Sequence, residues 1–372
     1  MADGDKGIQL AEIARHFDVR GTFASGEPYG SGHINDTYAA WYDQGGTAVR
    51  YIHQRINSGI FKDPVTLMEN IKRVTEHTRN KLLAGGAGEI TRKTLTLIPT
   101  PEGEVFYVDD EGNFWRTYIF IEKARTYDQL ESPPQAFEAA KSFGAFQAML
   151  ADLPAPRLSE TIPDFHNTPK RFEALMGAIE RDSPKRADGA RQEIEFALER
   201  KERISTIVDR LQSGDLPERI THNDTKLNNV MIDDATGEGI CVIDLDTVMP
   251  GCALYDFGDM VRSATNSSME DEPDVSKVCM RMDVFEALVK GYLESAGTFL
   301  TASEKELLVF SGRLITFEIG LRFLSDYLEG DVYFKTHREG QNLDRCRVQF
   351  ALLASMEAQE EQMEAVVDQC RQ

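Results

Sequence analysis

The chain has 372 residues, of which 41% are hydrophobic and 28% are charged, enough for packed cores under a polar surface. Its 62 acidic and 41 basic side chains leave a formal net charge of -21, which disfavours binding to nucleic acid and to anionic membranes. Five scattered cysteines without a C-x-x-C pair are typical of reduced thiols. With no secretory signal and no membrane-spanning run, we expect a cytoplasmic protein.

The first third of the chain is predicted to form mostly strands. Short runs rich in β-branched and aromatic residues, separated by Gly and Asp clusters, favour this structure. A helix should interrupt them, since Pro64 suits a first helical position and apolar residues follow at helical spacing. The predicted strands cover residues 37–42, 48–56, 94–98, 105–108 and 114–121.

From about Pro134 the pattern becomes helical, with apolar residues at intervals of three and four. One β-hairpin, within 229–246, is predicted inside this part. The sequence therefore predicts an α+β fold with a β-rich N-terminal lobe, 1–122, and a mainly helical C-terminal lobe, 123–372. The predicted helices cover residues 137–150, 191–211, 284–293, 304–329 and 343–372.

The chemistry is concentrated in the segment THNDTKLNN, which begins at Thr221, and in the segment VIDLD, which ends at Asp246. Asp224 is followed five residues later by Asn229, and the hairpin then leads to Asp244. Phosphoryl transfer uses a carboxylate that takes the acceptor's proton, and an amide and a second carboxylate that hold Mg²⁺ against ATP phosphates. Asp246 is either a second metal contact or a surface turn residue.

This spacing resembles the aminoglycoside phosphotransferase and choline kinase superfamily, whose loop is H-x-D-x-x-x-x-N followed by an I-D strand. The resemblance implies a two-lobed protein-kinase-like fold and an ATP-dependent, Mg²⁺-dependent kinase with Asp224 as the catalytic residue. It implies that His222 and Asp256 support the catalytic loop. We interpret Asp259 as a carboxylate on the surface of a helix.

The N-terminal lobe is expected to bind the nucleotide. Gly30 and Gly32 form a turn whose backbone N–H groups can approach phosphates. By the resemblance, the next strand should carry a phosphate-binding cation, yet its position holds Gln54, with Arg55 beside it on the opposite face. We expect Gln54 and Arg55 at the nucleotide, with Arg55 or a second Mg²⁺ compensating for the missing cation. Glu122 ends the predicted hinge, where backbone groups would contact adenine.

Within the superfamily, the resemblance is strongest to the N-acetylhexosamine 1-kinases, and it extends to the segment RFLSDYLEGD that begins at Arg322. It implies an amino-sugar acceptor, N-acetylglucosamine or N-acetylgalactosamine, phosphorylated at the anomeric hydroxyl. The residues themselves add that Glu318, Arg322 and Asp326 share one face of an apolar helix, where a forked Arg can bind a neutral polyol. By the resemblance, the sugar pocket comprises His33, Asn223, Asp224, Arg322 and Tyr333.

Three other functions stay open on the sequence. The first is a kinase of the same fold that acts on choline, homoserine or an aminoglycoside. The second is a nucleotide-binding pseudokinase, suggested by the missing strand lysine. The third is a metal-dependent phosphohydrolase that uses His222, Asp224, Asp244 and Asp246. The sequence does not determine the oligomeric state.

Overall fold

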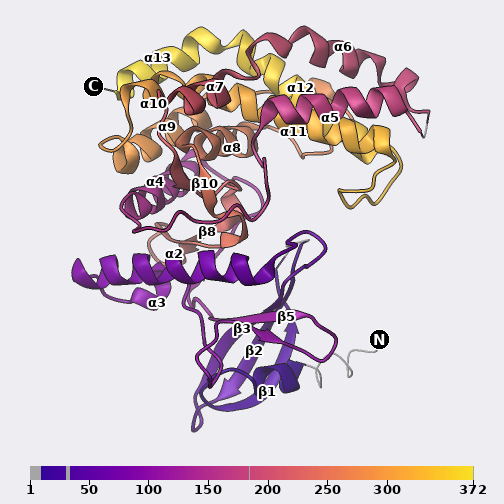
Figure 1. The fold of residues 1–372 in the computed structure, drawn as a ribbon. Helices are drawn as coiled ribbons and strands as arrows, with labels where there is room; N and C mark the ends of the chain where they lie inside the picture. Colours follow the sequence, from indigo (N-terminus) through magenta and orange to yellow (C-terminus); the bar gives the residue numbers. More distant parts are fainter. Residues whose placement is uncertain (1–9, 31–33, 184, 372) are drawn as a thin grey trace.

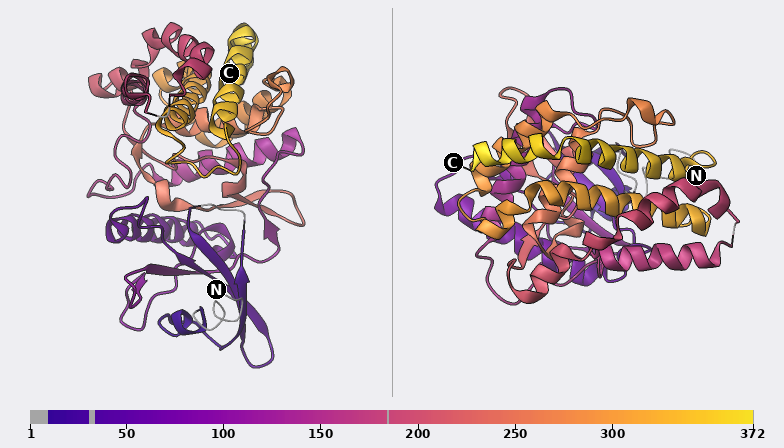
Figure 2. Two further views of the ribbon diagram at one scale, coloured as in Figure 1. Left: turned by 90° about the vertical axis from the view of Figure 1, so that its right-hand side faces the viewer. Right: turned by 90° about the horizontal axis from the view of Figure 1, so that it is seen from above.

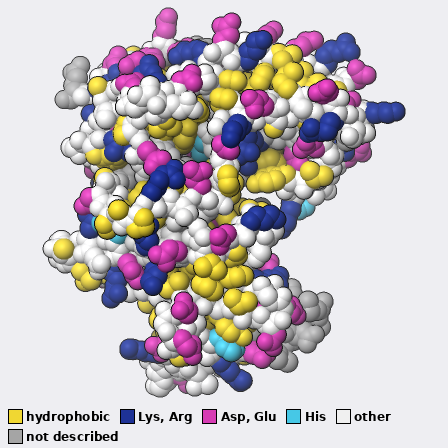
Figure 3. Space-filling view, in the orientation of Figure 1, with side chains coloured by type: hydrophobic (Ala, Val, Ile, Leu, Met, Phe, Trp, Pro, Cys, Tyr) yellow, Lys and Arg dark blue, Asp and Glu magenta, His cyan; other side chains and the backbone are white. Residues whose placement is uncertain are grey.

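The protein is an α+β molecule with a β-sheet in its N-terminal part and helices in most of the remainder, as predicted (Figure 1). This computed structural model describes residues 10–30, 34–183 and 185–371. The sheet lies at one end, the helical part at the other, and α2 (Pro64–Ala84) runs between them in both side views (Figures 1 and 2). The space-filling view shows a larger helical body above a smaller sheet body (Figure 3).

The N-terminal sheet has five antiparallel strands in the order β1-β2-β3-β5-β4. In the register of β3 and β5, Gln54 lies opposite Arg116, and His53 lies opposite Thr117. Because side chains alternate along a strand, these two pairs point to opposite faces of the sheet. The strands are β1 (Thr22–Pro28), β2 (Asp36–Asp43), β3 (Ala48–Arg55), β4 (Tyr107–Val108) and β5 (Phe114–Ile119).

Two strand predictions differ from the structure. Residues 94–98 form no strand and contribute only an isolated bridge between Leu97 and Tyr118. In contrast, β1 was not predicted, because its sequence TFASGEP is polar and contains Gly and Pro. It forms as the edge strand because β2 pairs with it from Thr22 to Pro28, with a register shift between Phe23 and Ser25.

The two faces of the sheet have different roles. One face packs Tyr42, Tyr51 and Trp115 against apolar side chains of the N-terminal segment 10–17, forming a separate small core. The other face looks towards α2 and the helical part. Helix α2 begins where the Asp63 side chain accepts a hydrogen bond from the Thr66 N–H, with Pro64 at the first position, as the sequence indicates.

The chain passes from the sheet to the helical part within residues 120–123. Strand β5 ends at Ile119, and β6 (Ala124–Arg125) already pairs with β8 (Val230–Asp233) of the predicted hairpin. The hairpin is completed by β9 (Gly239–Val242), which pairs antiparallel with β8.

The helical part contains several helices that the sequence pattern defined only in outline. The predicted helix 191–211 is divided by the polar run 199–203, and 304–329 is divided at Leu307. Helix α5 was not predicted, whereas α8 was indicated only through the helix expected at Asp256 and Asp259. The helices and short strands are α4 (Pro133–Leu150), α5 (Thr168–Arg181), α6 (Arg191–Glu199), α7 (Thr206–Ser213), β7 (Arg219–Thr221), β10 (Met249–Gly251), α8 (Ala253–Thr265), α9 (Met282–Ala296), α10 (Ala302–Glu306), α11 (Leu308–Glu329), α12 (Gln341–Ala358) and α13 (Glu360–Cys370).

Helix α8 is buried at the centre of the helical part and packs closely on α11 (Figure 1). A Cβ atom at Gly258 would lie 2.5 Å from the Ser311 carbonyl oxygen, so glycine is needed for this approach. The close packing fixes α8 beneath the catalytic-loop segment described below. Among the helices of the described residues, none is long and apolar enough to cross a membrane.

Candidate active site

The segment 222–229 forms a loop between β7 and β8, at the side of the helical part that faces the sheet. The β8–β9 hairpin brings Asp244 back beside this loop, because the Ile243 N–H donates to the Asn229 carbonyl oxygen at 2.9 Å. The sequence separation between Asn229 and Asp244 is thus closed by one antiparallel pair of strands.

Asp256, near the start of α8, supports the loop from below. Its carboxylate is fully buried and accepts the backbone N–H groups of His222 at 3.0 Å and Asn223 at 2.7 Å. Gln147 on α4 donates a third bond at 2.6 Å. Burial raises the pKa of Asp256, and these donors oppose that rise. The loop backbone is therefore held by a carboxylate on a rigid helix.

His222 and Asp259 complete this support. The His222 ring is buried, its Nε2 lies 2.8 Å from the Ile243 carbonyl oxygen, and its Nδ1 accepts the Asp224 N–H at 3.3 Å. Asp259 accepts the Thr225 N–H at 2.8 Å and pairs with Arg262. The surface interpretation of Asp259 is wrong, since the residue is only 3% exposed. Helix periodicity could have placed it on the Asp256 side, one turn further along α8.

Asp224 reaches solvent from this supported loop, with 26% of its side chain exposed. The Lys226 ammonium lies 3.1 Å from its Oδ2 atom. Although burial opposes it, the charge of Lys226, helped by His222, lowers the pKa of Asp224. Asp224 in turn raises the pKa of Lys226. Asp224 is thus ionised at neutral pH beside a cation that the sequence analysis had not singled out.

Asn229 and Asp244 provide oxygen atoms beside Asp224. Asn229 donates from Nδ2 to the Asp224 carbonyl at 2.7 Å and to its carboxylate at 3.2 Å, which leaves the amide oxygen for a cation. Asp244 has a left-handed backbone (φ 58°) and an exposed side chain. Loss of hydration beside the surrounding protein atoms, together with the negative charges of Asp246 and Asp224, raises the pKa of Asp244 to about 6.

This donor set suits Mg²⁺, which binds one or two protein oxygens and completes its shell with phosphates and water. A cation would also relieve the repulsion among the carboxylates at Asp244. Within the described residues, no group of three or more His, Cys, Asp and Glu side chains is arranged to hold a metal by itself.

The predicted nucleotide-binding residues have different surroundings. Gly30 has a left-handed backbone (φ 82°) that favours glycine, while Gly32 and His33 lie outside the described residues. Gln54 donates to the Thr37 hydroxyl at 2.8 Å on the face towards the helical part. Arg55 differs from the expectation, since it is paired with Asp36 on the other face and is not directed to the site.

Glu122, at the end of the predicted hinge, forms an ion pair with a side chain of the sheet. Its carboxylate forms a two-point ion pair with Arg50, at 2.9 and 2.5 Å, and the Arg50 guanidinium lies over the Phe120 ring. The carbonyl oxygen of Glu122 accepts a bond from Arg92 at 3.1 Å. These contacts anchor the crossing between the sheet and the helical part.

On the acceptor side, a buried network connects the catalytic loop to α11. His166 lies 3.1 Å from the Asn223 carbonyl oxygen and 2.7 Å from the Glu318 carboxylate, which also accepts from Thr168. Glu318 is fully buried and so does not face a ligand. The Asn223 side chain differs from its predicted sugar contact, because its amide bonds to the Thr221 and Thr247 carbonyls inside the loop.

Arg322 lies among aromatic rings next to this network. Its guanidinium carbon is 5.3 Å from the Phe165 ring and 5.7 Å from the Tyr333 ring. Tyr333 is exposed, and its turn is held by Asp326, which accepts the Tyr333 N–H at 2.7 Å. The three charged residues of α11 therefore separate into one partly exposed cation, Arg322, and two buried carboxylates, Glu318 and Asp326.

A second guanidinium, which the sequence analysis missed, lies close to Arg322. Arg171 on α5 donates to the Phe165 carbonyl at 2.8 Å, while its buried Nε has no hydrogen-bond partner. Burial and the charge of Arg322 lower the pKa of Arg171. In the part of the chain that the structure describes, neither arginine has a carboxylate within 4.0 Å. The nearest carboxylate influence comes from Glu318 and Asp164, which oppose the lowering of the Arg171 pKa without forming an ion pair with it.

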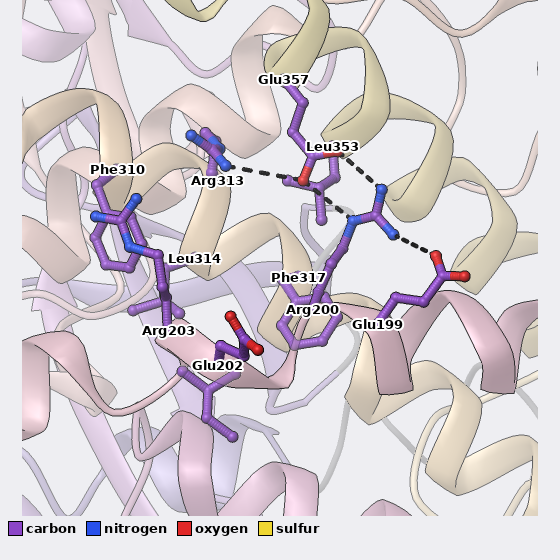
Figure 4. A pocket seen from close by; sticks show the side chains of 11 residues that line it. Glu199, Arg200, Glu202, Arg203, Phe310, Arg313, Leu314, Phe317, Leu353 and Glu357 are labelled. Carbon is purple, nitrogen blue, oxygen red and sulfur yellow. Dashed lines mark hydrogen bonds and ion pairs between the residues drawn. The ribbon is translucent and has the colours of Figure 1, made fainter.

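A separate pocket on the outer side of the helical part lies between residues 199–204 and helices α11 and α12 (Figure 4). Several of its lining side chains are apolar, and Glu357 pairs with both Arg200, at 2.9 Å, and Arg313, at 3.8 Å. None of the loop residues 222–229 lines it.

The chain is similar to known proteins over the region that contains this loop. A sequence model described as the phosphotransferase enzyme family (APH) matches residues 25–302. The chain belongs to this family. The matched region includes the sheet, α2, the catalytic loop and α8. Asp224, Asn229 and Asp244 therefore all lie within the part of this phosphotransferase that matches the family.

Solved structures share the fold over nearly the whole chain of the phosphotransferase. A microcompartment-associated aminopropanol kinase is similar with a TM-score of 0.60 and 14% identity, covering 96% of this chain and 98% of its own. Spectinomycin phosphotransferase in complex with ADP and spectinomycin gives 0.58 and 14%, covering 96% and 98%. Choline kinase from Cryptosporidium parvum gives 0.58 and 13%, covering 96% and 97%. These identities establish a common fold.

Proposed function

We propose that this phosphotransferase is an ATP-dependent kinase that transfers phosphate to the anomeric hydroxyl of an N-acetylhexosamine, forming the sugar 1-phosphate. The observation that carries the kinase assignment is the convergence of Asp224, Asn229 and Asp244 at one end of the β8–β9 hairpin. In this proposal residues 1–122 bind the nucleotide, and residues 123–372 provide catalysis and the acceptor site.

Asp224 would orient the acceptor hydroxyl and take its proton as the oxygen attacks the γ-phosphorus. Its lowered pKa keeps the carboxylate ionised and ready to accept at neutral pH. Lys226, 3.1 Å away, provides positive charge next to the developing negative charge of the transferring group. Asp256 and Asp259 keep this geometry by holding the loop backbone.

Asn229 and Asp244 would hold Mg²⁺, which neutralises charge on the β- and γ-phosphates when bound. The turn with Gly30 and Gly32 would cover these phosphates with backbone N–H groups, and Gln54 would lie beside them. Backbone groups before Glu122 would contact adenine. Spectinomycin phosphotransferase, whose fold this chain shares, is known in complex with ADP, and this supports nucleotide binding by the chain.

The acceptor site is the part that distinguishes among alcohols. The solved relatives include kinases of aminopropanol and choline, which are cationic. Here Arg322 and Arg171 lack a carboxylate partner among the described residues, and their charge would repel a cationic acceptor. A neutral sugar with an acetamido carbonyl can instead accept hydrogen bonds from guanidinium groups. Tyr333 offers an aromatic surface, and His33 is proposed as a further contact.

The test is a panel assay. Purified protein with ATP and Mg²⁺ would be incubated with N-acetylglucosamine, N-acetylgalactosamine, glucose, galactose, choline, homoserine and kanamycin, with products followed by phosphorus NMR. An anomeric sugar phosphate formed only from N-acetylhexosamines is expected. Transfer to choline or kanamycin would refute the sugar assignment but keep the kinase. ATP binding without transfer to any acceptor would favour a pseudokinase, and phosphate release from an aryl phosphate without ATP a phosphohydrolase.

A further inference from the structure

One cation of the sheet is completely buried between the two parts of the molecule. Arg116 on β5 is 1% exposed and lies opposite Gln54 in the strand register. Its Nε and Nη2 atoms donate to the Gln54 amide oxygen at 2.9 and 2.6 Å. Its Nη1 atom lies 2.5 Å from the Asp246 carboxylate. The guanidinium therefore joins two strands of the sheet to the turn that carries Asp244.

Asp246 receives a second contact from the N-terminal part. The Asn35 side-chain amide donates to its other carboxylate oxygen at 2.6 Å, and the Asn35 amide oxygen accepts the Asn57 N–H at 2.9 Å. Asn35 comes directly before β2, next to the turn expected to cover the phosphates. Asp246 is thus not a surface turn residue: it is 2% exposed, and each of its carboxylate oxygens lies beside a side-chain nitrogen of the N-terminal part.

Other cations that could serve here are engaged elsewhere or absent. The strand position expected to carry a Lys or Arg holds the neutral Gln54, and Arg55 is paired with Asp36 on the far face. From α2, the Met68 sulfur lies 3.8 Å from the Arg116 guanidinium, whereas Glu69 is exposed. Among the described residues, no lysine of β3 is therefore paired with a glutamate of α2.

We propose that Arg116 is the positioning cation of this active site: from β5 it holds Asp246, and through it the Asp244 turn, in the place from which Asp244 can hold the nucleotide's metal. It replaces the ion pair that kinases commonly form between a lysine of strand β3 and a glutamate of the neighbouring helix. This inference rests on the proposed function.

The physical reason is charge as well as shape. Asp246 lies two residues after Asp244, and without a cation its buried carboxylate would be an unpaired negative charge close to Asp244. Arg116 neutralises this charge through its Nη1 atom, while its Nε and Nη2 atoms donate to Gln54. The single nitrogen of a lysine cannot span both partners in this way. Because Arg116 itself is buried, its effect on the nucleotide should pass through Asp244.

The experiment measures nucleotide binding without any acceptor. The full-length wild type and the variants Arg116→Gln, Arg116→Lys and Asp246→Asn are titrated with ADP by calorimetry, with and without Mg²⁺. We expect Arg116→Gln and Asp246→Asn to weaken MgADP binding about ten-fold or more, with affinity for metal-free ADP changed less than about two-fold. Arg116→Lys should recover part of the loss.

Two further variants separate positioning from general destabilisation. Arg200→Gln removes a two-point ion pair with Glu357 in the outer pocket (Figure 4), and it should leave the MgADP affinity unchanged. If Arg116→Gln does not fold, the double variant Arg116→Gln/Asp246→Asn removes both charges together and should show the same loss of the Mg²⁺-dependent gain.

The possible outcomes are distinct. MgADP affinity unchanged in Arg116→Gln, or in the double variant, would overturn the proposal. An equal loss of ADP and MgADP affinity would also overturn it, because Arg116 would then contact phosphate directly. If the wild type binds no ADP at all, both the positioning role of Arg116 and the proposed function are refuted. A wild type that binds MgADP beside an insensitive Arg116→Gln refutes the positioning role alone.

Discussion

The two parts of the molecule hold polar groups in their interiors by different means. In the helical part, carboxylates of α8 accept backbone N–H groups of the catalytic loop, so Asp256 and Asp259 fix the chain itself. In the sheet, the buried polar contacts run between side chains, as from Arg116 to Gln54 and from His53 to Thr117. The hydrogen bonds from α8 fix the course of the loop backbone itself, whereas these contacts of the sheet fix single side chains.

The largest effect is expected at Asp224, the proposed proton acceptor. Asp224→Asn should lower kcat about 100- to 10,000-fold, because the amide cannot take the acceptor's proton. Its fold should persist, since the Asp224 carboxylate supports none of the α8 contacts. Turnover assays and thermal unfolding monitored by circular dichroism would check this. Near-wild-type turnover would remove Asp224 from the mechanism.

The next effect concerns the cation beside Asp224. Lys226→Met should lower kcat about 100-fold by removing charge stabilisation of the transferring group. Lys226 also lowers the pKa of Asp224, so its loss should raise that pKa and move the acid limb of kcat/KM to higher pH. Lys141→Met, which removes an exposed pair with Glu294 on the far helices, is the matched control. An unshifted acid limb would contradict the coupling.

The third prediction concerns the hydrogen bonds that Asp256 accepts from the backbone of the loop 222–229. Asp256→Asn can accept only at its amide oxygen, so a buried loop N–H group should lose its partner. We expect the free energy of unfolding to fall by about 1–3 kcal/mol, measured by urea denaturation. Asp188→Asn alters an exposed pair with Arg191 and should change it by less than about 0.5 kcal/mol. If the two variants have equal free energies of unfolding, Asp256 does not stabilise the loop in this way.

The smallest effect is a pH dependence of the sheet. Burial lowers the pKa of His53 to about 4, so the folded state binds its proton less readily than the unfolded chain. Stability linked to this residue is present above the unfolded pKa of about 6.5 and is lost as the pH falls towards 4. Between pH 7 and pH 5.5 the loss should be about 1 kcal/mol. His53→Gln should remove this part of the pH slope in urea unfolding, and an unchanged slope would contradict it.

Local patterns predicted much of the fold. The hairpin inside the helical part was predicted because two apolar runs flank a turn of polar residues and glycine, and strands β8 and β9 lie there. The long apolar helix before Gly330 was predicted from its periodicity, and the left-handed glycine ends it. Strand β1 was missed because its pairing with β2, and not its own composition, makes it a strand.

The sequence by itself determined the family resemblance and the spacing of Asp224, Asn229 and Asp244, because these residues lie on one loop and one hairpin whose geometry is local. Only the tertiary structure decided the partners of the buried charges. Arg116 and Asp246 are separated by 130 residues of chain, and Arg171 meets Arg322 across two helices. A sequence pattern shows which residues can carry charge, but their pairing depends on how separate elements pack, since the cost of burying a charge is relieved only by contacts between those elements.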